Sequence, residues 1–235
     1  MLSYARLTLL VTAAALSIAA GKPAGKPAEK SGGQTNWVAK VSATPSGAHV
    51  IGNPEAKIRL VEYVSYTCSH CAEFEKEASG ELALGFIRQG KGSLEYRSYL
   101  RNIVDVAATL MVGCGDPSRF PLNHSIMLRA QEKWLGNVPE AKQRNWATIS
   151  DFGSRMRTVA ADLHLYDQFE TRGYRRTDLD RCLSNEALAK AITQENQVAT
   201  SVGAVNGTPS FLINDRPQDA GDWASLRPLL LAMTK

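Results

Sequence analysis

The chain has 235 residues, 44% of them hydrophobic and 21% charged, with a formal net charge of +4 at pH 7. Residues 1–40 carry all of that excess, with five cationic side chains against one acidic side chain, so the rest of the chain is neutral. This balance gives no basis for nucleic acid or an anionic membrane as a partner. The chain after residue 47 is long enough for one domain with a sizeable insertion.

Residues 1–20 have the pattern of a cleaved export signal. Arg6 supplies a positive charge, and the apolar, small-residue run from Leu7 to Ala20 is shorter than the about 20 residues of a membrane helix. An uncleaved membrane anchor is the alternative. No cysteine lies near the cleavage region, so a lipoprotein is not indicated. Export predicts a periplasmic location, which is an oxidising compartment where disulfides persist.

Residues 21–47 are expected to form a flexible linker with short β candidates. The tetrapeptide Gly-Lys-Pro-Ala occurs twice in succession from Gly21 onward, and such a Gly, Pro and Lys-rich stretch cannot bury a core. Two short β candidates, 37–41 and 48–51, flank a Thr-Pro-Ser-Gly turn cluster.

The most informative motif is Cys-Ser-His-Cys at residues 68–71. It directly follows a predicted strand over 58–64 and opens a predicted helix over 68–88. Two intervening residues put the cysteines one helical turn apart on one face of the helix start. A disulfide can form at that separation and break again with little movement of the backbone. The context therefore favours a thiol–disulfide redox site.

Three other interpretations of this motif are open: a structural disulfide, half of a zinc site, and chance. A zinc site usually needs a second CxxC or an HxxxH partner. Cys114 and Cys182 are single and far apart, and His49, His124 and His164 have no ligand-like spacing. No metal and no organic cofactor is predicted.

The order of the remaining elements predicts an α/β fold. A strand over 94–99 completes a βαβ unit with two parallel strands, and helices are expected almost throughout 103–203. A late strand over 211–214, a turn over 215–217 and a helix over 223–233 complete a ββα unit. This order fits a thioredoxin-like fold with a large all-helical insertion between its βαβ and ββα units. The predicted segments of that domain are 48–102, 103–203 and 204–235.

A second signature is Gly-Thr-Pro-Ser at residues 207–210, before the late strand. In a thioredoxin fold a proline at this place is a cis-proline that faces the CxxC motif. The backbone of Thr208 could then pair with an extended substrate segment. We therefore expect Thr208, Pro209 and Ser69 to contact the substrate. An ordinary trans proline in a turn is the alternative for Pro209.

The Cys-Ser-His-Cys motif, the Thr-Pro loop and the helical insertion together resemble the DsbA family of exported thiol–disulfide oxidoreductases. The stretches 52–57 and 61–68 are also similar to that family's approach to its active site. The resemblance extends from about residue 48 to the C-terminus. Ser69 replaces the proline that the family commonly has between its cysteines, and Thr208 replaces its frequent valine. Both departures bear on the redox potential rather than on the fold.

The two cysteines should have different roles. Cys68 lies at a helix start, where unpaired N–H groups and the helix dipole favour an anion, so it should be the exposed sulfur that exchanges with substrate. Cys71 should be buried and resolve the mixed disulfide. The family resemblance implies that His70 donates a hydrogen bond or a positive charge to Cys68, and Ser69 could add a hydroxyl donor. A surface histidine without such a role is the alternative.

Two acidic residues are candidates for proton transfer. Glu62 falls on the apolar face of its strand, where a carboxylate is costly unless it is paired or protonated, and it could exchange protons with Cys71. Glu75 follows Cys71 by one helical turn and resembles an acidic position of the DsbA family. A structural ion pair or a solvated acid is the alternative for both residues.

Cys114 and Cys182 are expected to form a structural disulfide within the helical insertion, because two leftover cysteines in an oxidising compartment pair readily. Four cysteines allow three connectivities, and the CxxC spacing alone favours this one. Two buried thiols and a regulatory pair are the alternatives.

These features together predict an exported oxidoreductase that donates disulfides to reduced or unfolded exported proteins through a Cys68 mixed disulfide. The family resemblance implies reoxidation by a DsbB-like membrane quinone reductase, and we expect a monomer. One rival is a disulfide isomerase or reductase kept reduced by a membrane donor, although the stretch before residue 48 is short and polar for a dimerisation domain. Another is a thioredoxin-fold chaperone or binding module whose CxxC is structural.

Overall fold

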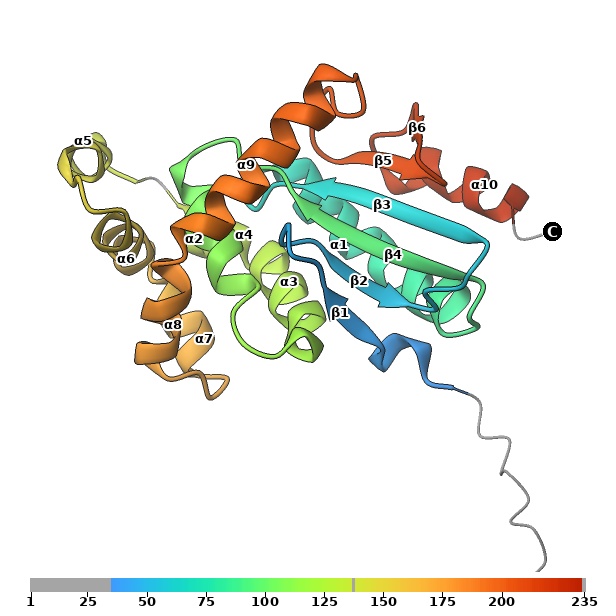
Figure 1. The fold of residues 1–235 in the computed structure, drawn as a ribbon, viewed down its shortest axis with the longest axis horizontal. Helices are drawn as coiled ribbons and strands as arrows, with labels where there is room; N and C mark the ends of the chain where they lie inside the picture. The colour runs from blue at the N-terminus through green and yellow to red at the C-terminus, as the bar shows by residue number, and fades with distance from the viewer. Residues whose placement is uncertain (1–34, 137, 234–235) are drawn as a thin grey trace, which may run out of the picture. The chain divides into compact units, whose positions relative to one another are not determined.

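A six-stranded mixed sheet forms the centre of the described residues, which are 35–136 and 138–233 of this computed structural model (Figure 1). The expected export signal over 1–20 lies outside the described residues, as does the linker up to residue 34. In spatial order the strands are β1 (Val41–Ala43), β2 (His49–Gly52), β4 (Gly92–Ser98), β3 (Ile58–Val64), β5 (Ser210–Ile213) and β6 (Arg216–Gln218).

The two central strands run parallel and the other neighbours pair antiparallel. β3 pairs with β4 in parallel, with Leu60 opposite Leu94, while β5 lies antiparallel on the other side of β3. The connection between β3 and β4 is α1 (Ser69–Glu81), which continues as a π-helical turn over Leu82–Ile87. The predicted βαβ unit is therefore confirmed.

Eight helices of the described residues separate the two halves of the sheet, as the sequence predicts for 103–203. They are α2 (Ile103–Val112), α3 (Phe120–Arg129), α4 (Gln131–Leu135), α5 (Glu140–Thr148), α6 (Phe152–Asp162), α7 (Leu165–Glu170), α8 (Arg176–Leu183) and α9 (Glu186–Ser201). Short 3₁₀ turns occur at Trp37–Ala39 and Pro117–Arg119. The chain then returns to the sheet as β5 and β6 and ends in α10 (Trp223–Met233), which confirms the ββα unit.

Alternation along β3 gives the sheet two apolar faces. Leu60 and Val64 belong to the main core, in which α1 and α10 also pack. Val61 and Tyr63 point the other way and pack in a second cluster with Ala199 of α9. Because both faces are covered, β3 is almost wholly buried, and the site at its end rests on a rigid element.

Two local predictions are wrong. The candidate strand 37–41 is a 3₁₀ turn, and the pairing strand starts at Val41, where alternate residues can bond to β2. This strand lies within the predicted linker. The expected turn over 215–217 is formed instead by Asn214 and Asp215, both with positive φ. Pro217 belongs to β6, an edge strand, where a missing N–H is tolerated.

No helix within 35–136 or 138–233 has both the length and the apolar character needed to cross a membrane.

Candidate active site

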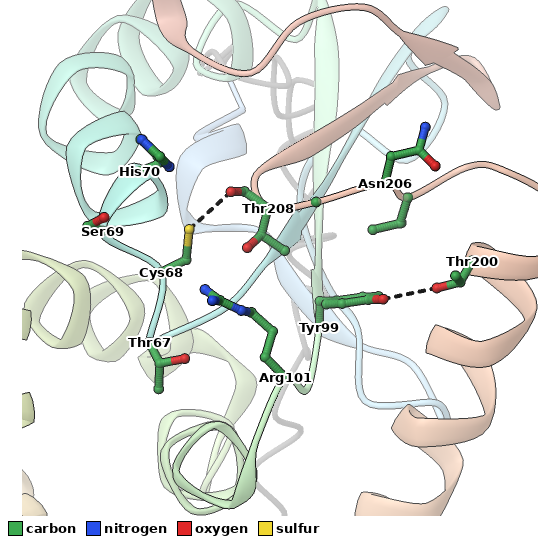
Figure 2. Close-up of a pocket in the computed structure, with 11 residues that line it drawn as sticks. Thr67, Cys68, Ser69, His70, Tyr99, Arg101, Thr200, Asn206 and Thr208 are labelled. Carbon is green, nitrogen blue, oxygen red and sulfur yellow. Dashed lines mark hydrogen bonds between the residues drawn. The ribbon is translucent and has the colours of Figure 1, made fainter.

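Cys68 lies at the N-cap position of α1, where the chain turns from β3 into the helix. Its backbone is extended, with φ −93° and ψ 119°. Its Sγ lies 3.0 Å from the carbonyl oxygen of Thr208, to which the thiol form donates a hydrogen bond (Figure 2). The peptide bond between Thr208 and Pro209 is cis, so the loop before β5 faces the cysteine pair as the sequence analysis expects.

The helix-start position predicts an exposed Cys68, but only 5% of this residue is accessible to solvent. The reason is the Thr208 loop, which lies against the sulfur. Cys68 still lines an open cavity of about 660 Å³ together with Tyr99, Arg101 and Asn206 (Figure 2). Cys71 is fully buried. One sulfur therefore lies at a cleft and the other lies beneath it.

The pKa values of the two thiols are shifted in opposite directions. A hydrogen bond from Cys71 is the largest cause that lowers the pKa of Cys68 from 9.0 to about 4. The Thr208 side chain and the backbone N–H groups of Cys71 and His70 lower this pKa further, against the opposing effect of burial. Burial raises the pKa of Cys71, and the charges of Glu62 and Cys68 raise it further. Near neutral pH the pair therefore holds one thiolate and one thiol.

Ser69 and His70, the two residues between the cysteines, are both exposed. His70 acts on Cys68 through its backbone N–H. No hydrogen bond joins its imidazole to the sulfur among the contacts of the described residues. The predicted role of the imidazole therefore stays a prediction. The same holds for the hydroxyl of Ser69.

Glu62 lies on the face of β3 that turns toward α1, as its place in the strand predicts. The residue is 1% exposed, and its Oε1 atom has no hydrogen-bond partner in the described part of the chain. Burial, and then the charge of Glu75, raises the pKa of this carboxyl well above 4.5. The charge of Glu62 is in turn one of the causes that raise the pKa of Cys71, and the predicted proton transfer between the two residues stays a prediction.

Glu75 is also buried, but it has partners. Its carboxylate lies 3.4 Å from Nε of Arg129 and 3.9 Å from Nε2 of His124. Burial raises the pKa of Glu75, whereas hydrogen bonds from Ser125 and Arg129 oppose the shift. Burial likewise lowers the pKa of His124 to about 3, so this ring is neutral. Glu75 thus forms part of a buried polar cluster behind α1.

Asp105 is a site residue that the sequence analysis missed. Its carboxylate accepts hydrogen bonds from the hydroxyl of Ser65, at 2.9 Å, and from both the N–H and the hydroxyl of Thr67, each at 3.0 Å. It also accepts from the N–H of Arg101 at 3.0 Å. Asp105 therefore fixes the turn that delivers Cys68. An acidic residue within the apolar helix 103–112 was the available signal.

Gln131 is a second missed residue. Its side-chain nitrogen donates to the carbonyl oxygens of Tyr66 and Cys68, both at 2.9 Å, and the residue is buried. It begins α4, so the helical insertion holds the active-site turn directly. A glutamine in a polar helix start carries no sequence signal for this role.

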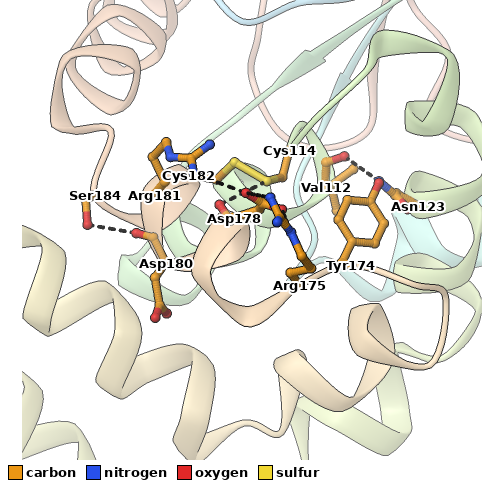
Figure 3. The surroundings of a disulfide bond; sticks show 10 residues. All are labelled: Val112, Cys114, Asn123, Tyr174, Arg175, Asp178, Asp180, Arg181, Cys182 and Ser184. Carbon is orange, nitrogen blue, oxygen red and sulfur yellow. Dashed lines mark hydrogen bonds and ion pairs between the residues drawn. A yellow bond between two sulfur atoms is a disulfide. The ribbon is translucent and has the colours of Figure 1, made fainter.

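Cys114 and Cys182 are joined by a disulfide in the helical insertion, with a Cα–Cα distance of 5.7 Å (Figure 3). The bond links the residues after α2 to α8. Next to it, Asp178 pairs with Arg175 and Arg181 on the surface. Neither sulfur lines the cavity at Cys68.

A family model described as thioredoxin matches residues 44–230, so this chain belongs to the thioredoxin family. The crystal structure of a protein-disulfide isomerase from Novosphingobium aromaticivorans is 44% identical, with a TM-score of 0.76, over 80% of this chain and 98% of that chain. Wolbachia pipientis alpha-DsbA1 is 17% identical, with a TM-score of 0.60, over 78% of this chain and 87% of that chain. That likeness shows that the fold is of the DsbA type.

A Rickettsia bellii protein, named provisionally as a protein-disulfide oxidoreductase, is 27% identical over 166 residues. The match covers 70% of this chain and 56% of the Rickettsia protein. The chain therefore spans about half the length of the curated relatives that it matches.

Proposed function

We propose that this protein is an exported thiol–disulfide oxidoreductase of the DsbA type that donates disulfides to reduced proteins. The observation that carries the proposal is the asymmetry of the cysteine pair. Cys68 has a pKa lowered to about 4 and lies at a cleft, while the pKa of the buried Cys71 is raised. A stable Cys68 thiolate is a good leaving group, so the oxidised pair gives up its disulfide readily.

In the first step a substrate thiolate attacks Sγ of Cys68 in the oxidised enzyme. A sulfur–sulfur bond forms between substrate and Cys68, and the bond between Cys68 and Cys71 breaks. Cys71 leaves with the electron pair and takes up a proton, since burial strongly favours its neutral form. Protonated Glu62 is the buried group that can supply this proton.

In the second step another thiolate of the substrate attacks the substrate sulfur of the mixed disulfide. A substrate disulfide forms, and Cys68 leaves as the thiolate that the helix start stabilises. The substrate has then lost two electrons, and the enzyme pair has gained them. The backbone of Thr208 beside Cys68 can bind the substrate as an added extended segment, with Pro209 fixing the loop.

Reoxidation of the enzyme must remove two electrons from the Cys68–Cys71 pair. A DsbB-like membrane quinone reductase that faces the periplasm is the partner that the DsbA resemblance suggests. Reduced exported proteins would be the substrates, and a monomer would suffice for the reaction, because the described residues from one chain form the whole cleft.

A disulfide isomerase is the second candidate, because the similar protein from Novosphingobium aromaticivorans is described as a protein-disulfide isomerase. An isomerase works from the reduced state, in which the Cys68 thiolate attacks a wrong disulfide. The same two cysteines serve both reactions. Their reduction potential decides which of the two reactions the protein favours.

The test is the redox equilibrium of the Cys68–Cys71 pair against glutathione, in a variant with Cys114 and Cys182 replaced by alanine. A potential of about −150 mV or higher supports the disulfide donor. A potential of about −250 mV or lower contradicts it and favours a reductase. Insulin reduction by the wild type that is lost in Cys68→Ser supports an enzyme. A wild-type protein that reduces no insulin would contradict both enzyme candidates and favour a binding module with a structural CxxC.

A further inference from the structure

Arg101 is the residue with a permanent charge among the described residues that line the cleft at Cys68. It lies between β4 and α2, and its side chain is exposed. Figure 2 shows the guanidinium directed toward Cys68 and Thr208, the two residues between which a substrate cysteine must enter. The proposed function leaves this side chain without a role.

The guanidinium of Arg101 has no ion pair within the part of the chain that the structure describes. Other arginines near the sheet do have acidic partners: Arg97 lies 2.7 Å from Glu95, and Arg227 lies 2.8 Å from Glu81. The backbone N–H of Arg101 donates to Asp105, so the start of the side chain is fixed. An unpaired guanidinium at a cleft can take a carboxylate in a two-point contact.

A second cavity, of about 580 Å³, is lined by Thr208 and by the residues that follow it, Pro209 and Ser210, and its charged lining residues are acidic. It shares His70, Gly207 and Thr208 with the first cavity. Its acidic lining residues are Glu73, Glu77 and Asp222. Hydrogen bonds from Ser225 lower the pKa of Asp222, which keeps that carboxylate charged. The two cavities therefore differ in charge, and they meet where the substrate cysteine reacts.

We propose that Arg101 binds a carboxylate of the substrate chain beside the reacting cysteine and thereby selects substrates with Asp or Glu on one side of it. The inference rests on the proposed function. An extended chain paired with Thr208 advances about 3.3 Å per residue, so a side chain two positions from the cysteine reaches into one cavity or the other. On the Arg101 side an acidic residue is attracted, and on the other side it meets like charges.

The direction of the substrate chain decides which side of its cysteine meets Arg101. If the chain runs antiparallel to the Thr208 loop, residues after the cysteine lie over Asn206 and Gly207 in the Arg101 cavity. If it runs parallel, residues before the cysteine lie there. A preference that holds on one side only therefore also reports the direction of binding.

The experiment uses the oxidised full-length protein and three reduced peptides. Each peptide carries a test cysteine and a second cysteine in a Gly-Ser spacer, so that oxidation to a peptide disulfide is complete and balanced by reduction of the enzyme pair. One peptide has neutral flanks, one has Glu two residues before the test cysteine, and one has Glu two residues after it. The readout is the second-order rate constant from acid quench and mass spectrometry.

We expect one of the two Glu peptides to react about two- to fivefold faster than the neutral peptide, the range that an exposed ion pair gives. Arg101→Gln should remove this preference, and Arg101→Glu should transfer it to a fourth peptide that carries Lys in place of the preferred Glu. Raising the salt concentration to about 0.5 M should weaken it. Arg144→Gln, at an exposed arginine on α5, is the matched control and should leave the preference unchanged.

A different role for Arg101, stabilising the Cys68 thiolate, gives a different result. In that case Arg101→Gln slows all three peptides alike and raises the pKa of Cys68, which thiolate absorbance measures. That result overturns the inference, as does an equal effect of Glu on both sides or no effect on either. In those cases disulfide transfer itself survives. A wild-type protein that oxidises no peptide would overturn the proposed function and this inference with it.

Discussion

Glu62 carries an ionisable group on a strand whose other inward side chains are apolar. The alternation of β3 places it with Leu60 and Val64 against α1, and its Oε1 atom is buried without a hydrogen-bond partner among the described residues. Folding therefore raises the pKa of this carboxyl. Burying the neutral acid costs less free energy than burying a carboxylate. The carboxyl group also interacts electrostatically with Cys71 when it ionises.

Because folding raises the pKa of Glu62, the free energy of unfolding depends on pH, and the direction of this dependence follows from the direction of the shift. In the unfolded chain Glu62 ionises above pH 4.5, whereas in the folded protein it stays protonated to a much higher pH. Stability is therefore greatest below pH 4.5 as far as this group is concerned, and it falls by about 1.4 kcal/mol per pH unit up to the folded pKa. Glu62→Gln removes this loss. We expect the urea midpoint of the variant to exceed the wild-type value by a margin that grows as the pH rises above about 4.5.

The control for this prediction is Glu55→Gln, at an exposed acid before β3. Its unfolding curve should follow that of the wild type at each pH. Parallel pH profiles for Glu62→Gln and the wild type would show that Glu62 does not keep its proton on folding. Reoxidation of the reduced Glu62→Gln variant should also slow at neutral pH, since Cys71 loses the buried carboxyl group with which it is proposed to exchange a proton.

At the scale of single residues, the sequence predicts features that depend on position within one element. The two cysteines and Glu62 are predictable because strand alternation and helix spacing act over a few residues. Asp105 and Gln131 are not, because their partners in the turn before α1 lie 38 to 65 residues away along the chain. Such contacts depend on how the helical insertion docks on the sheet, which no local pattern encodes.

At the scale of elements, α2 serves as the support of the active-site turn. Asn102 caps the helix by accepting from the N–H groups of Val104 and Asp105, and Asp105 then accepts from the turn before Cys68. The helix start and the cysteine turn therefore form one hydrogen-bonded unit. A substitution that breaks these hydrogen bonds should therefore change the pKa of Cys68 even though α1 itself is unaltered.

Asp105→Ala tests this coupling. It removes the carboxylate that accepts from the hydroxyl of Ser65 and from the N–H and hydroxyl of Thr67. The Thr67 N–H keeps Ser65 Oγ as an acceptor at 3.2 Å, whereas each buried donor that is left unsatisfied costs about 1–3 kcal/mol. We expect a loss of about 1–3 kcal/mol in the free energy of unfolding, measured with urea, and a raised pKa of Cys68. Asp105→Asn keeps one acceptor oxygen, so it should fold and show a smaller change of the same kind.

A Cys68 pKa equal to that of the wild type in Asp105→Asn, together with wild-type stability, would contradict the idea that α2 supports the turn. The measurement does not depend on activity, because the thiolate is detected by its ultraviolet absorbance.

At the scale of the whole molecule, the disulfide between Cys114 and Cys182 closes a loop with a sequence separation of 68 residues. It ties the end of α2 to α8 within the helical insertion (Figure 3). Replacing both cysteines by alanine should lower the free energy of unfolding by about 4 kcal/mol in the chain-entropy model. Urea unfolding of the two proteins measures the difference.

The same variant should keep the low pKa of Cys68, because neither Cys114 nor Cys182 lines the cavity. A wild-type protein that shows no change in stability on reduction of this bond would indicate that the insertion holds together without it. The serine pair Ser118→Ala and Ser201→Ala, both exposed, is a control for the number of substitutions.

The order of strands and helices was predictable at this scale because each segment shows its own period of apolar residues. The exact bounds of the short strands and of the turns between elements were not predictable. Strand β1 has only three residues, and Pro217 lies in a strand that tolerates it only because that strand is at the edge. Short edge strands carry little pattern of their own, since their neighbours in space determine them.

The exposure of Ser69 and His70 has a consequence for protein engineering. The frame around them is held from outside the motif, by Asp105 on one side of the turn and Gln131 on the other. Both intervening side chains project from this frame without filling the core. We therefore expect that substitutions at these two positions change the reduction potential of the cysteine pair without changing the fold. A library that varies only Ser69 and His70 should yield variants with many different reduction potentials.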